Sequence, residues 1–160
     1  MAIYTLLRGG ENLPWFYSIW NRYVIPKHTF ISFFAATNTL GTKENYMHWG
    51  FQMANRCVLC DSAEETRDHL FFDCPFAQLV WIKCSQILRV QCPLRPLLVE
   101  LTALQQLRRR DRFRSMLVIS LVYTILFERT RRIHRHSQQS AIALANSLLF
   151  HLRVKWVSCH

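Results

Sequence analysis

Three cysteines and one histidine near the middle of the chain have the spacing of metal ligands. Cys57 and Cys60 are separated by two residues, so both can reach one ion from a tight turn. His69 follows after eight more residues and Cys74 after a further four, and this pair can complete a tetrahedron. Four sulfur and nitrogen donors with no open position are typical of a structural zinc site rather than a catalytic one. The pattern therefore predicts one structural Zn²⁺ with four ligands: Cys57, Cys60, His69 and Cys74.

Residues around these ligands predict the elements that position them. Ser62 and Glu65 have the spacing of a capping box, which predicts a short helix that presents His69. Cys74 precedes Pro75, and proline is favoured at the first position of a helix, so a second helix is expected to begin there. Free amides and the helix dipole at that end stabilise a thiolate, the ligating form of cysteine. These features favour zinc over a chance grouping of four unrelated residues.

The rest of the chain predicts a mainly α fold: a small helical domain stapled by a Cys3His zinc knuckle, followed by a long helical C-terminal part. Apolar residues at helical spacing predict helices over 15–23, 29–36, 43–49, 75–90, 97–135 with a break near 111, and 140–156. The run from Met116 to Phe127 is too short to cross a bilayer and predicts a buried helix. The expected organisation is an irregular lead-in over 1–14, a zinc-binding domain over 15–92 and a basic helical region over 93–160.

The composition indicates an intracellular protein with an anionic partner. The formal net charge is +10, and three zinc-bound thiolates (−3) with the ion (+2) would lower it only to +9. So basic a domain attracts polyanions, of which nucleic acid is the commonest in cells, although the charge could also serve only solubility. The chain shows no signal-peptide pattern, and its six cysteines fit metal binding and free thiols. We expect an intracellular location, with the nucleus as one option, and neither secretion nor a membrane span.

Two arginine-rich stretches flank the apolar run from Met116 to Phe127. As a helix this run is about 18 Å long, so its two ends could straddle a duplex groove or track a single strand. The alternative is that both stretches are solvated helix ends. Aromatic residues within 15–23 could also stack on bases, but such a stripe is more typical of a core. The predicted nucleic-acid contacts are Arg108, Arg109, Arg110, Arg112, Arg114, Arg129, Arg131, Arg132 and Arg135.

Several short segments around the zinc pattern match those of a known family. They are Cys57-Val-Leu-Cys60, Glu65-Thr66, His69-Leu70-Phe71-Phe72, Cys74-Pro75-Phe76-Ala77 and Val80-Trp81, with Ile19-Trp20, Pro26-Lys27, Phe33-Phe34, Leu40 and Thr42 upstream, and Glu128-Arg129 and Arg131-Arg132 downstream. With these residues the chain resembles, over roughly 15–135, the zinc-binding domain at the C-terminal end of plant non-LTR (LINE-type) retrotransposon reverse transcriptases. It departs from the family at Thr130, where asparagine is usual, and lacks a tryptophan often found after Phe34.

The resemblance implies a non-catalytic appendage of a retroelement polymerase that helps to engage nucleic acid, either RNA or DNA. No pair of carboxylates stands in a strand–turn setting that could hold two Mg²⁺ ions, and 160 residues leave no room for a polymerase palm and fingers. We therefore expect no enzymatic activity. Nucleic acid is the expected partner, with a retroelement polymerase as a candidate protein partner. The alternative function is a zinc-stabilised protein–protein interaction module that binds no nucleic acid.

Overall fold

The computed structural model describes residues 13–90, 95–105 and 112–158, and these residues fold into helices joined by turns. Within these residues, the β-type pairing is limited to an isolated antiparallel bridge between Arg56 and Glu64. The predicted mainly α class is confirmed. The helices are α2 (Phe16–Ile19), α3 (Pro26–Ala36), α4 (Lys43–His48), the π-helical turn η2 (His69–Asp73), α5 (Pro75–Leu88), α6 (Leu97–Gln105), α7 (Arg112–Arg135) and α8 (Ala141–Ser158).

The first predicted helix, over 15–23, is wrong in its length, because α2 ends at Ile19. The side chain of Asn21 donates to the carbonyl of Ser18 at 2.9 Å. The same side chain accepts from the amide of Tyr23 at 3.1 Å. An asparagine that bonds to nearby backbone groups in this way favours a turn over a continued helix.

The next helix begins three residues earlier than predicted, because Pro26 starts α3 rather than preceding it. The short helix predicted over 43–49 is confirmed by α4. Thr42 caps it by accepting from the amide of Asn45 at 3.3 Å. Gly50, with φ +91°, follows the helix in a conformation that suits glycine.

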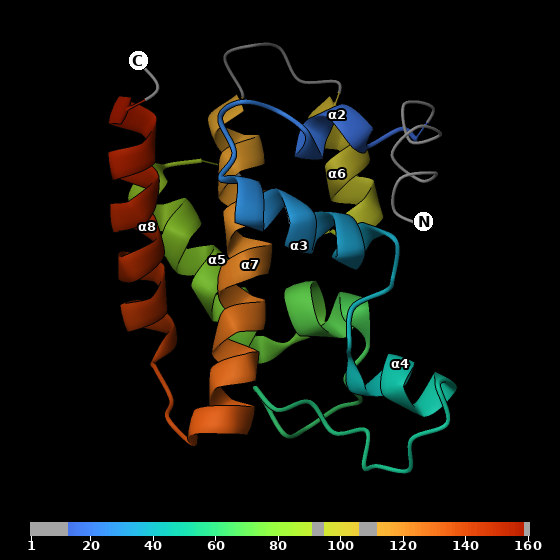
Figure 1. Cartoon of the computed structure of the whole chain (residues 1–160). Helices are drawn as coiled ribbons and strands as arrows, with labels where there is room; N and C mark the ends of the chain where they lie inside the picture. Colours follow the sequence, from blue (N-terminus) through green and yellow to red (C-terminus); the bar gives the residue numbers. More distant parts are fainter. Residues whose placement is uncertain (1–12, 91–94, 106–111, 159–160) are drawn as a thin grey trace.

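Helix α7 runs through the middle of the fold, with α3 packed across it and α8 alongside (Figure 1). All residues from Ser115 to Val122 are buried, so the helix is enclosed on every side there. This confirms the prediction that the apolar run forms a buried helix. Within the described part of the chain, none of the helices combines the length and apolar character that a bilayer span requires.

Residues on both sides of position 92 share one hydrophobic core. Helix α5, which follows the metal ligands, packs against α8, and α3 packs against α7. Cys84 lies on α5 and is fully buried, as expected for a small core residue. The zinc-carrying segment and the C-terminal helices therefore stabilise one another.

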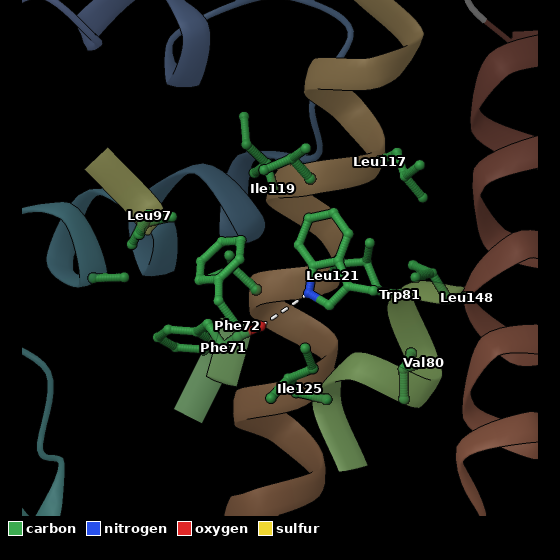
Figure 2. Packing of buried hydrophobic residues seen from close by; sticks show 14 of the residues in the cluster. Phe71, Phe72, Val80, Trp81, Leu97, Leu117, Ile119, Leu121, Ile125 and Leu148 are labelled. Atoms are coloured by element: carbon green, nitrogen blue, oxygen red, sulfur yellow. Dashed lines mark hydrogen bonds between the residues drawn. The ribbon is translucent and has the colours of Figure 1, made fainter. Parts of the chain in front are cut away.

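Trp81 joins α5 to η2 in this core. Its side chain is 1% exposed, and its indole nitrogen donates to the Phe71 carbonyl at 2.9 Å. Figure 2 shows this bond, with Phe72 beside the indole and α7 behind it. The two rings of Phe72 and Trp81 have centroids 5.3 Å apart. The bond fixes the turn that carries His69 against the core.

Replacing Trp81 with phenylalanine should therefore lower the free energy of unfolding by about 1–3 kcal/mol, because a buried carbonyl loses its donor and some ring volume is lost. Urea denaturation of the zinc-loaded protein measures this. Ile82→Val, on the half-exposed neighbour, is the matched control and should cost less than about 1 kcal/mol. Equal midpoints for the two variants would contradict a structural role for the indole bond.

Candidate metal centre

The four predicted ligands converge on one point. One donor atom from each of Cys57, Cys60, His69 and Cys74 lies within 4.8 Å of all the others. The Sγ atoms of Cys57 and Cys74 are 3.9 Å apart, and the Cys60 Sγ lies 3.3 Å from the His69 Nε2. A tetrahedral zinc ion with ordinary bond lengths places its donors about 3.5–3.8 Å apart. The observed separations are close to these values, so the donor set fits a single zinc ion after small side-chain movements.

A tight turn positions the first two ligands. The amide of Asp61 donates to the Cys57 carbonyl at 2.8 Å, and the amide of Cys57 donates to Ala63 at 2.8 Å. Asp61 itself has φ +53°, a left-handed conformation that aspartate tolerates better than most residues. This closed knuckle keeps the two cysteine side chains on one side.

The predicted capping box at Ser62 and Glu65 is wrong, because residues 62–65 form no helix. Ser62 instead donates through Oγ to the Cys60 Sγ at 3.1 Å, which stabilises negative charge on that sulfur. Thr66 caps the turn before the histidine, and its Oγ1 accepts from the His69 amide at 3.1 Å. Glu65 is fully buried and has partners elsewhere, so it is not available as a cap.

The second pair of ligands stands at the two ends of η2. The amide of Cys74 donates to the carbonyl of His69 at 2.7 Å, across five residues. This i→i+5 hydrogen bond closes a larger ring than the i→i+4 bond of an α-helix. It brings the two ends of the turn together, so both side chains can reach one ion. Cys74 then directly precedes α5, with Pro75 at its first turn, as predicted. Phe71 and Phe72 point into the core from the same turn.

The two buried thiols, Cys57 and Cys74, influence each other. The hydrogen bond from Cys57 lowers the pKa of Cys74, and the backbone amides of Phe76 and Ala77 in the first turn of α5 lower it further. The Cys57 thiol shares its proton with the Cys74 sulfur in this hydrogen bond, and the bond, together with burial, raises the pKa of Cys57. A Zn²⁺ ion replaces that shared proton and stabilises both thiolates, which is the usual basis of metal binding by cysteine.

A buried ion pair connects the metal loop to α7. Arg129 donates to Glu65 at 2.6 Å, and the Glu65 side chain is fully buried. Glu65 also accepts from the backbone amides of Lys43 at 3.1 Å and Val58 at 3.3 Å. One carboxylate thus holds together α4, the knuckle and the central helix. This makes Glu65 and Arg129 the main polar support of the site.

The neighbouring arginines also support the metal loop. The buried carboxylate of Glu128 accepts from both Arg131 and Arg132. Arg132 donates further to the carbonyl of Leu59 in the knuckle at 3.0 Å, and its guanidinium lies 4.3 Å from the ring centre of Phe76. The last turns of α7 therefore pack against both sides of the metal site.

The nine arginines predicted to contact nucleic acid are consequently of different kinds. Arg129, Arg131 and Arg132 make the pairs above, and Arg114 pairs with the buried Glu100 at 2.6 Å. These four stabilise the fold by pairing with buried carboxylates. Arg135 is exposed. Arg112 begins α7, and the remaining three lie outside the described residues: Arg108, Arg109 and Arg110.

Comparison with known proteins assigns the part of the chain that carries the site to a family. The model of the family described as zinc-binding in reverse transcriptase matches residues 1–81. The chain belongs to this family. The match contains all four donors and ends within α5, and the later helices complete the core around it. Searches of curated proteins and of solved structures gave no match. Family and donor geometry together support one structural Zn²⁺, which the protein uses as a crosslink between the knuckle, η2 and α5.

Proposed function

We propose that this chain is a non-catalytic accessory domain of a retroelement reverse transcriptase, of the plant LINE type, that assists nucleic-acid binding. The closed Cys3His donor set carries the proposal, because it matches the family and leaves no coordination position for a substrate. The four donors are proposed as the zinc ligands. Their role is to hold the fold rather than to perform chemistry.

The distribution of charge supports nucleic acid as the partner. Three of the ten acidic residues, Glu65, Glu100 and Glu128, are fully buried against arginines. The pairs Glu65–Arg129 and Glu100–Arg114 are neutral, and Glu128 with its two arginines keeps +1, so +9 of the formal +10 belongs to the remaining residues. Exposed cations are distributed over several elements: Arg89, Arg95, Arg135 and Arg153. Such a surface attracts phosphate backbones.

Binding to a labelled oligonucleotide should therefore weaken steeply with salt. Each neutralised phosphate contributes about −0.7 to the slope of log Kobs against log salt for a single strand, and about −0.9 for a duplex. A mobility shift or anisotropy titration at several salt concentrations measures the slope. Binding that is the same at low and high salt would contradict the proposal.

An exposed apolar run next to the knuckle favours the second candidate, a protein-interaction module. Met47, Trp49, Phe51 and Met53 follow one another along α4 and the loop after it, and each is more than 40% exposed. Exposed apolar groups of this kind often mark protein contacts. A protein that shows no affinity for oligonucleotides at low salt would favour this candidate over the first.

A further inference from the structure

A pocket of about 290 Å³ lies between α3, α7 and α8. In Figure 1, α3 crosses α7 and α8 runs alongside α7, so both pack against the same central helix. The volume is near the lower end of the range of about 300–1,000 Å³ for small-molecule sites, so one small planar group fits better than a long segment of polymer. None of the metal ligands lines it. The pocket is therefore a second feature of the fold, separate from the zinc site.

One wall of the pocket is a row of aromatic rings. His28 stacks on Tyr123 with centroids 4.1 Å apart, and Tyr123 stacks on Phe127 at 6.1 Å, with interplanar angles of 21° and 15°. A bond of 3.0 Å between the His28 Nδ1 and the Ser120 Oγ holds the first ring. Burial, helped by the nearby charge of Lys27, lowers the pKa of His28 to about 4, so the imidazole is neutral at pH 7. The row ends at Phe127, which is 50% exposed.

Cationic groups border this aromatic wall. The Lys27 Nζ lies 5.1 Å from the centre of the Tyr123 ring. Arg131 also lines the pocket. Because Arg131 and Arg132 share the single carboxylate of Glu128, this group of three side chains keeps a net charge of +1. His151 and Ser147 add polar atoms, and none of the described lining residues is acidic.

Stacking rings beside cations are the combination that binds single-stranded nucleic acid. We propose that this pocket binds one unpaired nucleotide, with its base stacked on the Phe127 end of the aromatic row and its phosphate contacted by Lys27 and Arg131. This inference rests on the proposed nucleic-acid function and names its contact site. A paired base is not available for such stacking, because both of its faces are covered in the duplex.

Two oligonucleotides and two variants test the pocket. The probes are a labelled ten-nucleotide oligothymidylate and a strand of the same length with abasic sites, which keeps the phosphates and lacks the bases. Phe127→Leu keeps an apolar side chain but removes the stacking face. It should weaken oligothymidylate binding at least about fivefold and leave abasic binding unchanged. Lys27→Gln should weaken both probes and reduce the salt slope by about 0.7.

Matched changes outside the pocket are the controls. Phe150→Leu alters a ring on α8 that is 66% exposed, and Arg153→Gln removes an exposed cation on the same helix. Phe150→Leu should leave both affinities as in the wild type. Arg153→Gln should change the affinities for the two probes by the same factor. Thermal unfolding of each variant checks that the fold is kept.

The outcomes separate this inference from the function on which it rests. If the wild type binds neither probe, single-strand binding and the pocket inference are overturned, and a duplex of the same length, titrated in parallel, decides whether the proposed function stands. If the wild type binds both probes equally well and Phe127→Leu binds like Phe150→Leu, the proposed function stands and the pocket inference is wrong. A loss confined to oligothymidylate and to Phe127→Leu supports the pocket.

Discussion

A Cys57→Ser, Cys60→Ser double variant should lose its zinc and, with it, the fixed structure of residues 57–81. Structural zinc contributes about 10–16 kcal/mol in zinc-finger peptides, which is comparable to the whole stability of a typical domain, about 5–15 kcal/mol. Here the ion ties the knuckle to η2 and to the start of α5. Hydrogen exchange measured by mass spectrometry should show the amides of this segment losing most of their protection.

Removal of zinc from the wild type by a chelator should give the same pattern, and added Zn²⁺ should reverse it. Cys84→Ala is the control, because Cys84 lies on α5, is as buried as Cys57, and is not part of the donor cluster. It should keep its metal and the protection of residues 57–81. Unchanged protection in the double variant would show that the segment folds without the ion.

Arg129→Met should destabilise the protein by about 3–5 kcal/mol, because it leaves the buried carboxylate of Glu65 without its counter-ion. Glu65 is fully buried, and its partner at 2.6 Å comes from a position 64 residues later in the chain. The methionine preserves much of the side-chain volume, so the loss reports mainly on charge. Urea denaturation of the zinc-loaded protein provides the free energy of unfolding.

Two comparisons make this measurement specific. Arg56→Met removes an ion pair with Asp61 in which both side chains are exposed, and it should cost less than about 1 kcal/mol. A Glu65→Leu, Arg129→Met double variant removes both buried charges and should cost clearly less than the sum of its two single changes. A cost of Arg129→Met no larger than that of Arg56→Met would contradict the structural role of the pair.

The zinc site was predictable because its information is local. Cys57 and Cys60 lie in one turn, and His69 and Cys74 lie at the ends of another, so their spacing alone restricts how they can meet. The helices around α7 were predictable for a similar reason, since apolar spacing reports directly on burial. The start of α5 followed from Pro75.

The role of the arginines was not predictable in the same way. Glu65 has the spacing of a helix cap, and nothing near it in the sequence indicates a partner on α7. A basic run looks the same whether it faces a phosphate or a buried carboxylate. One local signal existed: Glu128 precedes Arg131 and Arg132 by three and four residues, the spacing of ion pairs within a helix. The early end of α2 likewise depends on side-chain bonds of a single asparagine.

The metal content of the native protein tests the central claim most directly. Native mass spectrometry of the wild-type chain, with the Cys57→Ser, Cys60→Ser variant beside it, measures the number of ions per chain. We expect one zinc ion on the wild type and none on the variant. A wild-type chain that carries no metal after purification in the presence of Zn²⁺, or a variant that keeps its full zinc content, would contradict a zinc site built from these four side chains.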